Sequence, residues 1–271
     1  MQSIEVIVFW CTIFSYTLIF GLHLYGFVTQ RQRLANLAYR LLWGAFALHT
    51  LTGITHWIAS GHAPVTGTYE LNLTGTWCTT LIFLGFVSVR RLDKTIGLVV
   101  VPIVFLVLGH GYVAGIEINP LGTAFQSPWL AVHVLFAWLA FGGYAVATGA
   151  SALLLLKMQF SASERLRKLP PSEELDQTAY RFVVLGFINH SIMVVSGAIW
   201  AKKLWGHYWS WDPLETWSLI SFLAYAMYLH TRSFFKWKMQ RAAWLAIACL
   251  IVLAISFWGV DWFAPSIHPG P

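Results

Sequence analysis

Charged side chains are scarce in this sequence. Asp, Glu, Lys and Arg make up 10% of its 271 residues, whereas 58% of the residues are hydrophobic. A soluble domain needs far more polar surface to cover its core, so the composition excludes an ordinary soluble protein. The formal net charge of +6 does not indicate nucleic-acid binding, because the basic residues lie in short connections. The sequence therefore predicts an integral membrane protein.

Paired cysteines are missing as well. Cys11, Cys78 and Cys249 are each isolated within an apolar run and form neither a CxxC motif nor a zinc-type spacing. Thiol chemistry by this chain is therefore not indicated. The first apolar run is not expected to be a cleavable signal peptide, since no basic residue precedes it and no small-residue cleavage site follows.

Long apolar runs dominate what is present. Eight of them can cross about 30 Å of hydrocarbon at about 1.5 Å per residue. They lie near residues 4–28, 37–59, 70–89, 95–114, 129–156, 182–200, 214–230 and 241–262. In lipid the backbone must satisfy its own hydrogen bonds, so these runs are expected to be helices. The predicted fold is an all-α, polytopic membrane bundle of about eight transmembrane helices, forming a single membrane domain over residues 1–271.

Basic residues set the predicted orientation. Of the 17 Lys and Arg residues, all except Lys202 and Lys203 fall in alternate connections. The positive-inside rule places those connections in the cytoplasm. Both termini then lie outside. The charged segment 157–181 is expected to be a solvated cytoplasmic connector.

A Trp-rich segment, residues 205–217, lies on the predicted outer side and reads WGHYWSWDPLETW. An interfacial aromatic belt explains scattered tryptophans, but it does not readily explain Trp205, Trp209 and Trp211 within seven residues. Indole rings offer stacking area, and their N–H groups can meet carboxylates, which suits the flat face and polar edge of a porphyrin. The segment is therefore a candidate porphyrin seat.

Polar residues around this segment have two interpretations. Asp212 before Pro213 is typical of a helix start, with Asp212 as N-cap and Glu215 in the first turn, so both acids have a structural role available. Lys202 and Lys203 are either snorkelling anchors at a helix end or partners for porphyrin carboxylates. The sequence leaves both interpretations of the lysines open.

Ten histidines are many for so apolar a chain. Neutral imidazole is a common axial ligand of haem iron, so two outer histidines flanking an aromatic floor would make a haem site. The expected depths are the outer surface for His56, His62, His110, His133, His207 and His268, mid-membrane for His49 and His190, and the cytoplasmic end for His23 and His230. For the mid-membrane pair, hydrogen bonding between helices is favoured over their pairing with each other.

Residues 205–217, continuing through 225–232, resemble the WWD signature of the CcsA (ResC) family of cytochrome c biogenesis proteins. This family belongs to a haem-handling superfamily that also includes CcmC and CcmF. Further matches are residues 57–64 with Tyr69-Glu70, His133-Val134, residues 196–201 and residues 257–261. The resemblance spans nearly the whole chain.

The resemblance implies a haem lyase that carries haem b across the membrane and attaches it to the CxxCH motif of apocytochrome c on the outer side. It implies a CcsB (ResB) type membrane partner and thiol-reducing, thioredoxin-like membrane proteins. The implied location is the bacterial cytoplasmic membrane, with the active face outside, or alternatively a thylakoid membrane.

The resemblance also implies roles for individual residues. His133 and His268 correspond to the outer axial ligands, although the residues around His268 differ from the family pattern. His230 corresponds to a ligand of haem within the membrane, and its second ligand is either His23 or a residue of another subunit. The implied floor of the outer site is formed by Trp205, Trp209, Trp211, Asp212 and Trp217, with Lys202 and Lys203 beside it.

Other classes of protein remain as alternatives. A regulatory or chaperone protein of HemX type would bind haem in the membrane without lyase activity. A di-haem cytochrome b would place histidine pairs at repeated positions on facing helices, and the histidines here do not repeat in that way. A solute transporter is the weakest alternative, because no discontinuous helix with a polar substrate site is evident.

Overall fold

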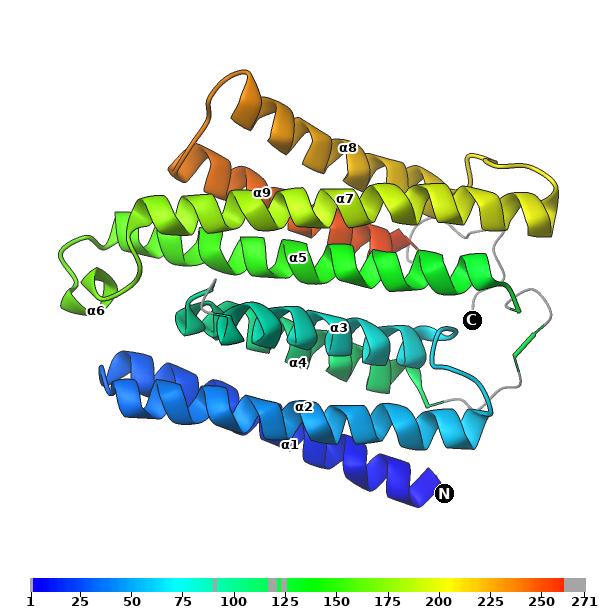
Figure 1. Cartoon of the computed structure of the whole chain (residues 1–271), viewed down its shortest axis with the longest axis horizontal. Coiled ribbons are helices and arrows are strands. Elements are labelled where there is room, and N and C mark those ends of the chain that lie inside the picture. The colour runs from blue at the N-terminus through cyan, green and yellow to red at the C-terminus, as the bar shows by residue number, and fades with distance from the viewer. Residues whose placement is uncertain (1, 90–91, 117–120, 123–125, 261–271) are drawn as a thin grey trace. The chain divides into compact units, whose positions relative to one another are not determined.

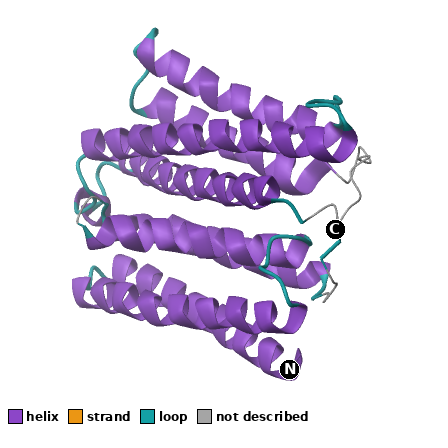
Figure 2. Ribbon diagram, turned by 45° about the vertical axis from the view of Figure 1, so that its right-hand side comes forward, coloured by secondary structure: helices purple, strands orange, loops and turns teal. Residues whose placement is uncertain are grey.

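A computed structural model of the chain describes residues 2–89, 92–116, 121–122 and 126–260. Throughout these ranges the regular structure is helical and no strand occurs, as Figure 2 shows. The all-α prediction is confirmed. The chain forms two compact units, the first made of residues 1–122 and 160–170 and the second of residues 123–159 and 171–271. That both units serve one haem-handling domain stays a prediction.

In its described residues, unit 1 consists of four long helices and two short helical turns. Helix α1 packs against α2 and α4, and α3 packs against α2 and α4, as Figure 1 shows. Its elements are α1 (Gln2–Val28), α2 (Gln32–Ser60), α3 (Thr68–Ser88), η1 (Lys94–Ile96), α4 (Gly97–Ala114) and α6 (Glu164–Arg167).

Unit 2 is built around α5, which packs most extensively against α7 and also contacts α9. The α5 and α7 backbones approach closely at Gly143 and Gly186, where a Cβ on Gly143 would lie 3.2 Å from the backbone nitrogen of Gly186. Small residues at a crossing permit such close packing in membrane helices. The elements are α5 (Pro128–Gln159), α7 (Ser172–Trp205), α8 (Pro213–Ser233), α9 (Gln240–Ala254) and a π-helical turn, η3 (Ile255–Gly259).

Six helices of the described chain are long and apolar enough to cross a membrane. They correspond to α1, α3, η1 with α4, α5, α7, and α9 with η3. Helices α2 and α8 are of similar length but more polar; α2 buries His49, Thr52 and His56. In the described residues, each of the eight predicted runs therefore appears as a helix, while the crossing of the membrane by α2 and α8 stays a prediction.

The connector expected over residues 157–181 is shorter than predicted. Helix α7 begins at Ser172, so the last ten residues of the expected connector are helical. Asp176 lies within this helical stretch. It is 5% exposed, and its carboxylate accepts hydrogen bonds from Arg232 at 2.8 and 3.0 Å. A charge pattern read as solvated surface is here a buried ion pair, which hydropathy along the chain does not reveal.

Candidate functional site

The Trp loop, residues 206–212, connects α7 to α8 and is fixed at both ends. Gly206 ends α7 in the left-handed conformation (φ +83°), and its N–H donates to the carbonyl of Lys202 at 3.1 Å. Asp212 begins α8, and its carboxylate accepts the N–H of Leu214 at 2.9 Å. The predicted N-cap is confirmed, with Pro213 as the first helical residue.

Glu215 closes the Trp loop from inside the first turn of α8. Its Oε2 accepts the backbone N–H of Ser210 at 2.7 Å and the Ser210 hydroxyl at 2.9 Å. A carboxylate in the first turn also interacts favourably with the helix dipole. The structural role expected for Glu215 is confirmed.

Two indoles of the loop lie together in an unusual backbone setting. Trp211 has φ +63° and its side chain is 70% exposed, although a non-glycine residue pays a steric penalty in the left-handed region. The ring of Trp209 meets that of Trp211 edge to face, with centroids 5.9 Å apart. In the described chain, Nε1 of Trp209 is buried without a hydrogen-bond partner. The loop thus holds an exposed indole beside an unsatisfied N–H donor.

The other two tryptophans of the predicted floor are half-buried and lie at the flanks of the Trp loop. Trp205, the last residue of α7, packs edge to face on Trp200 at 5.2 Å. Trp217 lies in the second turn of α8. The described contacts therefore bring Trp209 and Trp211 together, and they place Trp205 against a residue outside the predicted set.

Lys202 and Lys203 are exposed, and each lies over an aromatic ring. Nζ of Lys202 donates to the carbonyl of Gly206 at 2.6 Å and lies 5.6 Å from the Tyr208 ring centroid. Nζ of Lys203 lies 5.8 Å from the ring centroid of Trp129, in the first turn of α5. These cation–π contacts hold two positive charges at the base of the loop.

His133 lies one turn further along α5 than Trp129. Its Nδ1 is 2.9 Å from the carbonyl oxygen of Met193 on α7. A carbonyl only accepts, so Nδ1 donates its hydrogen, and in the neutral ring Nε2 then carries the lone pair. Histidines that bind metals are commonly oriented by such a hydrogen bond from the other ring nitrogen. His133 is therefore held in a coordination-competent tautomer.

Gly197 makes room for this imidazole, which the sequence alone did not predict. A Cβ on Gly197 would lie 2.6 Å from Nδ1 of His133. No side chain fits at that distance without moving the ring. His268, the second predicted outer ligand, lies outside the described residues.

His230 lies in the last turn of α8, at the opposite end of this helix from the Trp loop (Figure 1). Its side chain is exposed, and its ring stacks on Phe234 with centroids 4.5 Å apart. His23 belongs to unit 1 and is 2% exposed, and both its ring nitrogens lack a partner in the described chain. Pairing of His23 with His230 stays a prediction.

The two histidines that were predicted near mid-membrane form hydrogen bonds between helices, as the sequence favoured. In unit 1, His49 Nε2 donates to the Leu73 carbonyl at 3.0 Å, and Nδ1 lies 3.1 Å from the Tyr16 hydroxyl. In unit 2, His190 Nδ1 lies 3.3 Å from the Tyr144 hydroxyl. Both histidines therefore link helices within their own units.

Sequence reasoning missed a buried charged triad in unit 1. His56, expected near the outer surface, is fully buried, with Nδ1 2.7 Å from Glu5 Oε1 and Nε2 2.8 Å from Glu70 Oε1. Because carboxylate oxygens accept, two protons must be shared along these three side chains. Glu70 Oε2 also accepts the N–H and hydroxyl of Thr66. The triad ties α1, α2 and α3 to the connection that precedes α3.

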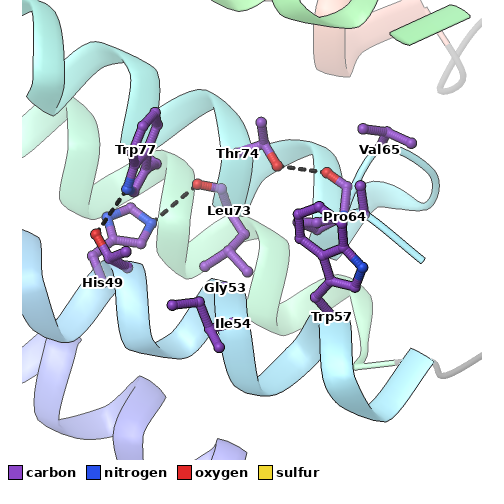
Figure 3. Close-up of a pocket in the computed structure, with 11 residues that line it drawn as sticks. His49, Gly53, Ile54, Trp57, Pro64, Val65, Leu73, Thr74 and Trp77 are labelled. Carbon is purple, nitrogen blue, oxygen red and sulfur yellow. Dashed lines mark hydrogen bonds between the residues drawn. The ribbon is translucent and has the colours of Figure 1, made fainter. Parts of the chain in front are cut away.

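A pocket of about 290 Å³ lies between α2 and α3 in unit 1, and Figure 3 shows its walls. Trp57, Ile54, Leu73 and Pro64 contribute apolar surface to it. The polar side chains that line it are already bonded within the protein: Thr74 donates to the Pro64 carbonyl, and Thr50 accepts from Trp77. The pocket therefore offers an apolar volume and little polar recognition.

In the described chain, no group of three or more His, Cys, Asp and Glu side chains gathers as a metal site. A haem iron needs only axial ligands from the protein. An anchored imidazole, two indoles, an unsatisfied indole N–H and two lysines are chemically suited to haem with its carboxylates.

Comparison with known proteins gives a consistent result. The family model described as Cytochrome C assembly protein matches residues 69–268. The chain is 30% identical over 285 residues to cytochrome c biogenesis protein CcsA of Synechococcus sp. (strain CC9605), covering 93% of this chain and 92% of that protein. It is also 30% identical to CcsA of Chlamydomonas reinhardtii, of which it spans only 63%.

A solved structure has the same fold. The structure named Cytochrome c Heme Lyase CcmF superposes with a TM-score of 0.68 at 20% identity, over 96% of this chain and 49% of that one. The chain thus spans about half the length of this structural relative. On the family match and on the identity to CcsA across most of its length, this chain belongs to the cytochrome c assembly protein family and, within it, to the CcsA proteins.

Proposed function

We propose that this protein presents haem on the outer side of a membrane and promotes its covalent attachment to the CxxCH motif of apocytochrome c. The observation that carries the proposal is the end of unit 2, where the start of α5, the end of α7 and the Trp loop meet. There His133 is fixed through Met193, and the exposed Trp211 lies beside the unsatisfied N–H of Trp209.

Each group would have a distinct role at this site. Nε2 of His133 would bind the iron, and the indoles of Trp209 and Trp211 would support the porphyrin face. Lys202, Lys203 and the Trp209 N–H would meet the carboxylates. His268 is proposed as the second outer ligand, and Trp205, Asp212 and Trp217 as the supporting frame of the loop.

The bond-forming step demands little acid–base chemistry from the protein. A cysteine thiol adds across a vinyl group, so that sulfur bonds to one carbon and the hydrogen goes to the other, with no external oxidant or reductant. Holding the two reactants in contact supplies much of the acceleration, roughly 7–11 kcal/mol in well-oriented model reactions. The chain's contribution is therefore to hold haem and leave its vinyl edge accessible.

The remaining parts of the proposal follow from the family and the charge pattern. Haem b is the proposed cargo, entering at His230, with His23 or a residue of another subunit as the second ligand there. A CcsB-type membrane subunit and thioredoxin-like thiol reductants are the proposed partners. The Trp loop is proposed to face the periplasm, or the lumen in a thylakoid, because the basic residues cluster in the opposite set of connections.

The test replaces the anchored ligand. His133→Ala should abolish accumulation of a co-expressed reporter holocytochrome c, and added imidazole should restore part of it by occupying the vacated position. Normal accumulation without imidazole would show that the ligand assignment is wrong. If deletion of the protein altered haem synthesis but left cytochrome c maturation intact, a HemX-type role would replace the lyase.

A further inference from the structure

The connection from α8 to α9, residues 234–239, is an ordered loop. It lies at the end of α8 that is remote from the Trp loop (Figure 1). Lys236 and Met239 have positive φ values of +55° and +54°, which residues other than glycine rarely adopt. Such backbone conformations persist only where surrounding contacts impose them.

A buried ion pair between Arg232 and Asp176, called the clasp below, holds the loop in this conformation. Arg232 donates to both carboxylate oxygens of Asp176 at 2.8 and 3.0 Å, and its side chain is only 8% exposed. The same guanidinium donates to the carbonyl of Trp237 at 3.1 Å, and Asp176 Oδ1 accepts the N–H of Met239 at 2.8 Å. Bidentate pairs of this kind are geometrically specific, so the clasp fixes the loop relative to α7.

The loop places two aromatic rings against the imidazole of His230, which lies in the last turn of α8. Phe234 stacks on His230 at 4.5 Å, and Phe235 meets the same ring edge-on at 5.7 Å. Phe234 is 73% exposed and Phe235 is 63% exposed. Lys236 and Lys238 are exposed on the same six-residue segment. An imidazole, two phenyl rings and two cations thus lie on ten consecutive residues, 230–239.

We propose that residues 234–239 recognise the ring edge and carboxylates of a porphyrin whose iron His230 binds, with Phe234 and Phe235 as ring contacts and Lys236 and Lys238 as carboxylate partners. This inference rests on the proposed haem-handling function. Aromatic and basic residues at an inner membrane interface are often simple anchors. Anchors, however, do not require packing on a histidine or a buried ion pair that holds strained backbone, and the lysines complement a dianionic ligand.

The test compares two porphyrins that differ only in charge. Purified full-length protein carrying His133→Ala and His268→Ala, so that neither proposed outer ligand remains, is titrated with iron protoporphyrin IX and with its dimethyl ester, and binding is followed by the Soret band. In this parent background, with both lysines intact, the ester should bind about fivefold more weakly than the free dicarboxylic acid. In Lys236→Gln/Lys238→Gln the two ligands should bind equally, a pattern that a structural role of the lysines would not produce.

The aromatic contacts are tested in the same titration. Phe234→Ala/Phe235→Ala should weaken binding of both porphyrins about tenfold and alter the Soret band, because the imidazole loses its bracket. Phe160→Ala and Arg165→Gln are matched controls, since Phe160 is 52% exposed and Arg165, in α6, is also exposed, and both lie between α5 and α7. These two variants should bind like the parent.

The outcomes separate this inference from the proposed function. If His230→Ala in the same background leaves porphyrin binding unchanged, the inner ligand assignment itself is wrong. If His230→Ala removes binding but the lysine and phenylalanine variants match the controls, only the recognition role of residues 234–239 is overturned. Thermal unfolding of each variant establishes that a loss of binding is not a loss of fold.

Discussion

Two connections of this molecule have the same local hydrogen-bonding pattern, but one is tied to a buried core and the other exposes an aromatic side chain. The first loop, residues 61–67, joins α2 to α3 in unit 1, and the Trp loop, residues 206–212, joins α7 to α8 in unit 2. In each, a left-handed glycine ends the helix and a histidine follows it. In each, a glutamate early in the next helix accepts the N–H and hydroxyl of one loop residue, Thr66 or Ser210.

The difference lies in the other contacts of the glutamate. Glu70 is 4% exposed and also meets His56, which itself meets Glu5, so the first loop is tied to a buried charged triad. Glu215 is half-buried, and its loop exposes Trp211 in a strained conformation. The same closure thus fixes a core in unit 1 and presents a surface in unit 2. Removing equivalent residues should therefore have unequal consequences.

The largest expected effect on stability is at Glu70. Glu70→Ala leaves His56 and Glu5 buried with an incomplete set of partners, which should cost about 3–5 kcal/mol of unfolding free energy. Glu215→Ala removes only the closure of the Trp loop and should cost about 1–2 kcal/mol. Unfolding of both variants in detergent measures the contrast. Equal losses would mean that the triad adds nothing to the closure.

An intermediate effect, on ligand binding, is expected at Trp211. Trp211→Gly relieves the left-handed strain, so the unfolding free energy should stay level or rise by up to about 1 kcal/mol. Haem affinity of the proposed outer site should fall roughly fivefold with the loss of one aromatic face. Haem titration and thermal unfolding on the same sample separate the two quantities. Loss of stability together with unchanged affinity would contradict a ligand-presenting loop.

The smallest effect should be the same in both loops. Gly61 and Gly206 have φ values of +78° and +83°, and a Cβ on either would meet nothing within 4 Å. Gly61→Ala and Gly206→Ala should therefore each cost about 1 kcal/mol, from backbone conformation alone. Parallel measurements on the pair sharpen the comparison, because a markedly larger cost in one loop would reveal a constraint that the other lacks.

Most of the helices could be predicted from the sequence, and their ends less well. The run predicted near 182–200 extends back to Ser172, because Asp176 finds Arg232 56 positions away in the sequence. Helix α2 carries His49, Thr52 and His56 yet remains a long helix, because those side chains face the interior of unit 1. Hydropathy averages over such polar residues and does not record which face they occupy.

The candidate site was predicted in composition but not in arrangement. The crowding of tryptophans marked the Trp loop, and the Asp212-Pro213 pair marked the start of α8. Neither pattern could indicate that Trp211 adopts a positive φ, that Gly197 makes room for His133, or that Phe234 stacks on His230. The pairings in the clasp at Asp176 and in the triad at His56 could not be predicted, since their members come from different helices.

The sequence by itself determined the membrane class, the helix-and-connection order and the local caps, because hydrophobic run length and capping chemistry act over a few consecutive residues. Only the tertiary structure decided which nitrogen of His133 carries the lone pair, which charges are paired and which tryptophan is exposed. Those properties depend on groups brought together from separate helices: the Met193 carbonyl lies 60 residues from His133 in sequence, and Glu5 lies 51 residues from His56. A proton position or a buried charge is set by its neighbours in space, and packing alone supplies those neighbours.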